Sequence, residues 1–131
     1  MLRLSMVAAL AVAGMAVLPA TATAQPDTSP CDYELSAPQI VRVGNIDMVT
    51  ATMTPAACDR ATPYMSVACV QLQGNPGPGR CKQNNGPLTA QVFYSPHQPG
   101  ATYVATGRGC AVKGNPPEPF CEPTGPITAT L

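Results

Sequence analysis

Apolar and polar residues alternate along several short stretches of this chain, with the two-residue period of a strand that buries one face. In residues 49–54, every second residue is threonine, and the residues between are valine, alanine and methionine. The same period runs through residues 126–131 and residues 88–95. A period of two places every second side chain on the same side of a sheet. These stretches are therefore predicted to be half-buried β-strands.

Further strands are predicted near residues 33–43, 64–72 and 102–106, which are rich in valine, alanine, tyrosine and threonine. Beyond residue 24, no segment longer than about ten residues has apolar residues at helical spacing without a proline or a glycine in it. Six or seven short strands with turn signals between them favour an all-β fold. We expect an immunoglobulin-like β-sandwich of about seven short antiparallel strands, cross-linked by disulfides.

One hairpin can be placed from its turn. A strand over residues 33–43 followed by an antiparallel strand over 46–54 would be joined by Gly44-Asn45, which suits a tight two-residue turn. Cys31 and Cys58 lie just outside these two strands. A disulfide between them would close the open end of the hairpin.

An internal repeat with a period of about 40 residues relates residues 64–90 to residues 103–129. Five anchors match in order: Tyr64 with Tyr103, Cys69 with Cys110, Gly74-Asn75-Pro76 with Gly114-Asn115-Pro116, Cys81 with Cys121, and Gly86–Ala90 with Gly125–Ala129. Each unit is predicted to contain a strand, a Gly/Pro turn, a return strand with the second cysteine, and a further strand.

The first residues have the pattern of a cleaved signal peptide. Arg3 precedes an apolar stretch over residues 4–18, and Ala22-Thr23-Ala24 has the small residues that a signal peptidase requires. We expect cleavage after Ala24, which leaves residues 25–131 as a single domain. The alternative is a membrane anchor, but the apolar run is shorter than the roughly 20 residues needed to span a bilayer. No membrane span is therefore expected in the mature form.

An even number of cysteines behind a secretion signal indicates three disulfides in an oxidising compartment. Six cysteines allow fifteen connectivities. If the two repeat units are equivalent, the simplest solution pairs Cys69 with Cys81 and Cys110 with Cys121, which leaves Cys31 for Cys58. The protein is expected to be secreted, either extracellular or in the cell envelope.

The charge balance excludes one class of function. Seven lysines and arginines balance seven aspartates and glutamates, so no basic excess exists to bind a nucleic-acid backbone. With 11% charged and 45% hydrophobic residues, the composition is that of a folded chain rather than a disordered one.

Residues for catalysis are scarce. His97 is the only histidine, and prolines on both sides place it in an exposed turn without a positioned partner. If every cysteine is paired, no thiol nucleophile and no cysteine-type zinc site remain. No C-x-x-C spacing is present for redox chemistry.

The carboxylates are also few. Asp32 and Glu34, or Glu118 and Glu122, could in principle serve a two-carboxylate glycosidase, but the chain has no tryptophan for sugar stacking. The aspartates and glutamates near the N-terminal half lack the spacing of a calcium loop; they are Asp32, Glu34, Asp47 and Asp59. We therefore expect no catalytic residue, no metal site and no cofactor, and hence a protein that is not an enzyme.

Two loops that cysteines close are the best candidates for binding. They cover residues 74–80 and 114–120, and their candidate contact residues are Asn75, Arg80, Asn115 and Phe120. A loop that proline and a disulfide hold rigid loses little entropy on binding, and arginine and aromatic residues are common interface anchors. The alternative is that both loops are only rigid turns that resist proteolysis.

In pattern, residues 64–81 and 110–131 resemble the neocarzinostatin-type apoproteins, and the chain is similar to small immunoglobulin-like exported proteins of actinobacteria, of the mycobacterial type. No tryptophan lies on the third strand, so an antibody-type domain is not implied. The resemblance implies a carrier of a small apolar ligand, with a cleft between the repeat hairpins lined by residues such as Met65, Phe93 or Phe120.

Three functions compete. The first is a secreted, non-enzymatic binding protein whose partner is an unidentified protein or envelope component, met through the two loops. The second is the small-ligand carrier. The third is a protease inhibitor that presents Arg80, although the C-P-x-x-Y-D reactive-site pattern of the subtilisin inhibitors is missing.

Overall fold

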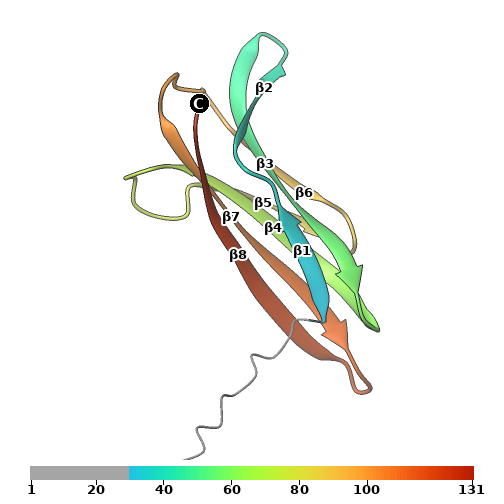
Figure 1. Cartoon of the computed structure of the whole chain (residues 1–131). Coiled ribbons are helices and arrows are strands. Elements are labelled where there is room, and N and C mark those ends of the chain that lie inside the picture. Colours follow the sequence, from blue (N-terminus) through green and yellow to red (C-terminus); the bar gives the residue numbers. More distant parts are fainter. Residues whose placement is uncertain (1–29) are drawn as a thin grey trace, which may run out of the picture.

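Two antiparallel sheets pack face to face in the computed structural model, which describes residues 30–131 (Figure 1). Eight strands form this part of the chain: β1 (Cys31–Leu35), β2 (Gln39–Val43), β3 (Ile46–Cys58), β4 (Ala61–Leu72), β5 (Arg80–Asn85), β6 (Ala90–Tyr94), β7 (Thr102–Lys113) and β8 (Glu118–Thr130). The predicted all-β sandwich is confirmed, with eight strands in place of about seven. The predicted signal peptide lies outside the described residues.

The first sheet is built around the long strand β3. Strands β1 and β2 pair with different halves of one edge of β3, and β6 pairs with the opposite edge. The single strand expected over residues 33–43 is therefore wrong, because the chain leaves the ladder at residues 36–38. There the Thr52 amide donates to the Ser36 hydroxyl at 2.9 Å, and Pro38, which has no amide hydrogen, is buried.

The turn predicted at Gly44-Asn45 is confirmed. Val43 pairs with Ile46 across it, and Gly44 has a φ of 63°, as the first central residue of a type II′ hairpin turn requires.

The second sheet has the strand order β5-β4-β7-β8, and it contains the two repeat units as neighbouring hairpins. The repeat aligns Cys69 with Cys110 and Met65 with Thr106. In the pairing of β4 with β7 these residues are exchanged: Met65 lies opposite Cys110, and Cys69 lies opposite Thr106. An approximate two-fold axis through the pair formed by Val67 and Arg108 therefore relates the hairpins.

The core lies between the sheets. Its fully or almost fully buried members are Val49, Ala51, Met53, Ala68, Val70, Ala90, Val92, Tyr103 and Ala105. The alternation predicted for residues 49–54 is confirmed, with one exception at Thr50. Thr50 is buried on the outer face, and its hydroxyl is satisfied there: it donates to the Val92 carbonyl at 2.9 Å and accepts from the Gln91 side-chain amide at 3.1 Å.

Each disulfide joins two cysteines that lie directly opposite one another in neighbouring strands. The pairs are Cys31–Cys58, Cys69–Cys81 and Cys110–Cys121, with Cα–Cα distances of 4.0, 4.1 and 4.1 Å. Such distances are typical of the close, non-hydrogen-bonded pairs of an antiparallel ladder. The connectivity inferred from the repeat is confirmed, and no free cysteine remains among residues 30–131. Three structural disulfides indicate an oxidising environment.

Candidate functional site

The two loops singled out in the sequence lie at opposite ends of the second sheet (Figure 1). The loop after β4 is next to the Leu72–Tyr103 pair, whereas the loop after β7 is next to the Ala61–Lys113 pair. Asn75 in the first loop and Asn115 in the second therefore do not share a surface. The expectation that both loops meet one partner together is not supported by this arrangement.

Arg80 and Phe120 belong to strands rather than to loop tips. Arg80 is the first residue of β5 and lies opposite Val70, and Phe120 lies on β8 opposite Ala111 with 39% of its surface exposed. The guanidinium carbon of Arg80 is 5.3 Å from the centre of the Tyr94 ring, a cation–π distance. Arg80 is thus directed toward β6 and the other sheet.

The cleft expected between the repeat hairpins does not exist. Strands β4 and β7 pair along their whole length, so the two hairpins form one continuous sheet. Met65 on β4 is half-buried, while Phe93 lies on β6 in the other sheet and Phe120 lies on β8. These three side chains do not line a common cavity.

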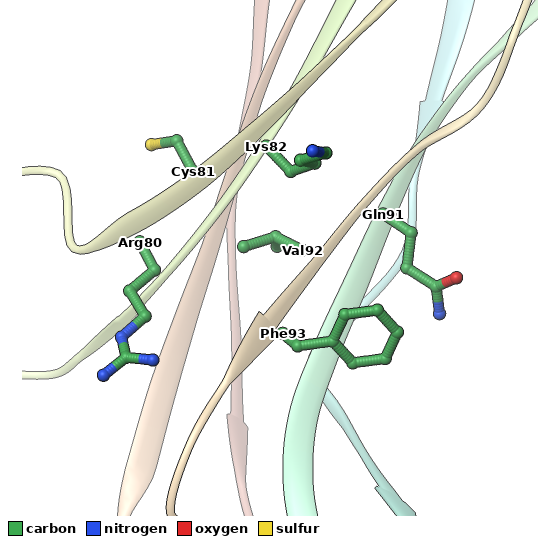
Figure 2. A pocket seen from close by; sticks show the side chains of 6 residues that line it. All are labelled: Arg80, Cys81, Lys82, Gln91, Val92 and Phe93. Atoms are coloured by element: carbon green, nitrogen blue, oxygen red, sulfur yellow. The ribbon is translucent and has the colours of Figure 1, made fainter. Parts of the chain in front are cut away.

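A groove is present instead along the open side of the sandwich, where β5 and β6 form neighbouring edges of the two sheets. Figure 2 shows the six residues that line it: Arg80, Cys81 and Lys82 from β5, and Gln91, Val92 and Phe93 from β6. Its volume is about 590 Å³. Of the four contact residues predicted in the loops, Arg80 alone lines this groove, and of the residues predicted for the carrier cleft, Phe93 alone does.

The connection between β5 and β6 creates the groove. After Asn85 the chain turns at Gly86, whose amide donates to the Tyr64 carbonyl at 2.9 Å, and it crosses to the first sheet. Strand β5 then pairs only with β4, and β6 only with β3, within the described chain. Both strands keep a free backbone edge on this side of the molecule.

The groove carries positive charge without a matching carboxylate. Arg80 and Lys82 are two residues apart on β5 and share one face of the strand. Within residues 30–131 neither forms an ion pair, in contrast to Arg42, Arg60 and Lys113, which contact aspartates. Two cations without an ion pair in this part of the chain, in a groove also lined by Val92 and Phe93, suit a ligand that has both acidic and apolar groups.

His97 is half-buried, not solvated as its turn sequence led us to expect. Its amide donates to the Asp47 carbonyl at 3.0 Å, and its ring centre lies 6.2 Å from that of Tyr103. Tyr103 fixes the same turn, because its hydroxyl accepts a hydrogen bond from the Gln98 amide at 2.9 Å. The buried Nε2 atom of His97 has no hydrogen-bond partner in the described part of the chain, so nothing there orients the ring for proton transfer.

The carboxylates remain apart. Asp32 and Glu34 are exposed on β1, and Glu118 and Glu122 are exposed on β8. No group of three histidines, cysteines, aspartates or glutamates in residues 30–131 is arranged to hold a metal ion.

Sequence reasoning gave no role to Tyr33, which packs over the backbone of Gly109. Burial raises the pKa of the Tyr33 hydroxyl above its ordinary value of 10.0, and the neighbouring Tyr64 and Glu122 raise it further. The hydroxyl is buried without a hydrogen-bond partner among the described residues. Its position depends on the contact between β1 and the second sheet, which no local pattern encodes.

Comparisons with protein-family models, curated proteins and solved structures find no match to this chain. Among residues 30–131, no helix is long and apolar enough to cross a membrane. The function is therefore argued from the geometry and charge of the groove.

Proposed function

We propose that this protein is a non-enzymatic binding protein of an oxidising compartment, secreted or in the cell envelope, that holds an acidic, extended segment of a partner protein in the groove between β5 and β6. The observation that carries the proposal is that Arg80 and Lys82 form no ion pair within residues 30–131 and lie on a strand whose outer edge is unpaired in that part of the chain. The three disulfides support the compartment.

An extended segment fits because strand edges bind strands. The free edges of β5 and β6 offer backbone donors and acceptors to an added peptide strand. In such a peptide, acidic residues two positions apart are separated by about 6.8 Å, which matches the spacing of Arg80 and Lys82 along β5. Phe93 on β6, 39% exposed, also lines the groove and offers an apolar contact there.

A small acidic ligand is the second candidate, because a volume of about 590 Å³ falls within the range of small-molecule sites. The protease-inhibitor hypothesis gains no support, because the Arg80 side chain lies against Tyr94 and does not project from a loop.

The test is an NMR titration of the oxidised protein with a synthetic decapeptide of alternating glutamate and valine. We expect saturable shifts at residues 80–83 and 90–94, and weaker binding at high salt. Lys82→Glu should weaken binding by about tenfold or more, because it replaces an attraction by a repulsion. Arg108→Glu is the matched control, since Arg108 is also exposed and unpaired within the described chain but lies on β7, away from the groove.

The proposal fails if the peptide causes no saturable shifts, or if Arg108→Glu weakens binding as much as Lys82→Glu. A decapeptide with glutamine in place of glutamate separates charge from strand addition. If it binds as tightly, the cations do not select the ligand and the acidic class is wrong.

A further inference from the structure

The hairpin of β2 and the start of β3 projects from the sandwich with its outer edge unoccupied (Figure 1). In the described chain, β2 pairs with β3 alone. The exposed surface of its large side chains is 48% for Ile40, 45% for Val43 and 50% for Ile46. Apolar side chains gathered at one protruding edge are typical of an interaction surface.

The register shows how these side chains are distributed. Val41 pairs with Met48 and Val43 pairs with Ile46, so these four residues share the face of the hairpin that points away from the core. Ile40 pairs with the buried Val49 and therefore lies on the opposite face. Apolar side chains therefore lie on both faces of the edge, with the Arg42–Asp47 ion pair on the face of Ile40.

The other edges of the sandwich have features that discourage pairing with an identical edge of a second copy. Strand β1 carries Asp32 and Glu34, and β5 carries Arg80 and Lys82. Strand β8 contains three prolines, and β6 lies beside β5. Charges and prolines are the usual means by which edge strands avoid further pairing.

Strand β2 lacks these features. It contains no proline and no lysine, and its one charge, Arg42, forms an ion pair with Asp47 at 3.1 Å. Of the edges in residues 31–130, β2 is the one best suited to pair with a copy of itself.

The two-residue turn determines which backbone amide and carbonyl groups of β2 point to the free edge. In a hairpin with a two-residue turn, the residues that flank the turn exchange hydrogen bonds, and every second pair does the same. Val43 and Val41 therefore direct their backbone groups to β3. The amide and carbonyl groups of Ile40 and Arg42 point to the free edge.

We propose that β2 pairs antiparallel with β2 of a second copy of this chain, about a two-fold axis at Val41, so that the first sheets of two copies become continuous. Val41 then faces Val41 of the second copy, and Ile40 faces Arg42. Ile40 and Arg42 exchange hydrogen bonds across the interface, and the symmetry repeats the exchange.

Charge makes this self-pairing specific to β2. The same operation on β1 would place Asp32 opposite Glu34, and on β5 it would place Arg80 opposite Lys82. On β2, Arg42 faces an uncharged residue. The dimer leaves the groove between β5 and β6 open in both copies, because β6 lies on the opposite edge of β3, so the inference is independent of the proposed function.

The first test is sedimentation equilibrium of the oxidised protein and its Ile40→Pro variant. Proline removes an amide that points to the free edge, so β2 can still pair with β3. We expect a reversible dimer for the unmodified protein and a dissociation constant about tenfold higher or more for the variant, because two symmetric hydrogen bonds are lost. Ile40→Thr, which keeps the amide, is the matched control and should remain dimeric.

The second test needs no proline and reports the register. In the proposed dimer, the two Val41 residues form a non-hydrogen-bonded pair with a Cα–Cα distance of about 4.5 Å, within reach of a disulfide. Val41→Cys should form a covalent dimer on mild oxidation, whereas Val43→Cys, which faces Gln39 of the second copy, should not. A protein that stays monomeric at all concentrations, or equal cross-linking of the two variants, would overturn the inference.

Discussion

The two cysteine-closed hairpins of the second sheet share sequence anchors but lie in different environments. In the first hairpin, β4–β5, Cys69 is half-buried, and Tyr64 is 37% exposed. In the second, β7–β8, Cys110 and Tyr103 are both fully buried. Strand β7 lies between β4 and β8, whereas β5 is an edge strand. A repeated motif therefore determines the hairpin and its disulfide, and the place of the hairpin in the sheet determines burial.

The hairpins also differ after their second cysteine. Residues 86–89 connect β5 to β6 in the first sheet, whereas the matching residues 125–128 continue within β8. The Gly125 backbone, with a φ of 93°, lies where the pairing of β7 and β8 shifts between Ala105 and Gly107. The same Gly-Pro motif thus ends one strand and bends another. This difference leaves β5 short and opens the groove.

The largest expected contrast concerns the aligned tyrosines. Tyr103→Ala should lower the free energy of unfolding by about 3–5 kcal/mol, because it empties a fully buried site. Tyr64→Ala should cost less than about 1 kcal/mol, since Tyr64 is partly exposed. Urea unfolding of the oxidised variants, followed by circular dichroism, measures both. Equal losses would mean that the two hairpins are energetically equivalent.

Removing each disulfide tests the same contrast. The bonds close loops of similar length, with sequence separations of 12 and 11 residues. Replacing either pair by alanine should therefore cost about 3 kcal/mol in the chain-entropy model. The Cys110/Cys121 variant should lose about 1 kcal/mol more, because a buried sulfur leaves a cavity at Cys110. Urea unfolding of the two variants measures both losses in the free energy of unfolding. A larger loss for the Cys69/Cys81 variant would contradict an effect of burial.

Substitutions of the residue before the first cysteine of each hairpin should change the stability less. Gly109 lies under the Tyr33 ring, and a Cβ there would overlap the ring. Gly109→Ala should therefore cost about 1–3 kcal/mol. At the matching position Ala68 is buried, and Ala68→Gly, which removes one methyl group and frees the backbone, should cost only about 1 kcal/mol. Thermal unfolding compares the two, and Tyr33→Ala should relieve the strain of Gly109→Ala if overlap with the ring is its cause.

The smallest effect is a pH dependence of stability due to Tyr33, the β1 residue that packs on the second hairpin at Gly109. Since burial raises the pKa of this hydroxyl in the folded state, the folded protein holds its proton more tightly than the unfolded chain. This contribution is fully present below pH 10.0 and is lost as the pH rises through the folded-state pKa. Unfolding curves between neutral and alkaline pH should show a steeper loss for the unmodified protein than for Tyr33→Phe. Identical slopes would assign the alkaline loss to other groups.

Sequence reasoning succeeded where the signal is local. The alternation over residues 49–54, the turn at Gly44-Asn45 and the three disulfides all depend on neighbours along the chain or within one hairpin. It failed at the Ser36–Pro38 break and gave no role to Tyr33, because these depend on which strands from distant parts of the chain pack together. A proline inside a predicted strand was the available signal for the break.

The candidate site was predicted only in part. Arg80 was predicted to bind as the last residue of a rigid loop. In the structure it lines a groove with Lys82 of the same strand, and its guanidinium lies against the Tyr94 ring of the other sheet. The spacing of Arg80 and Lys82 was visible in the sequence as two cations on one strand face. Gln91 and Phe93 could not be joined to them without knowing that the chain crosses between sheets after Gly86.

The placement of the disulfides has a mechanical consequence. Each of the three bonds joins strands of the same sheet, so between residues 31 and 131 the two sheets are connected covalently only where the backbone passes from one to the other, as at Asp59-Arg60. A load or a denaturant can therefore separate the sheets while every sulfur bond stays intact. The oxidised chain that results still contains two closed hairpins, β4–β5 and β7–β8, and the closed loop of β1, β2 and β3. Refolding from it requires the sheets to dock again rather than each closed unit to form anew.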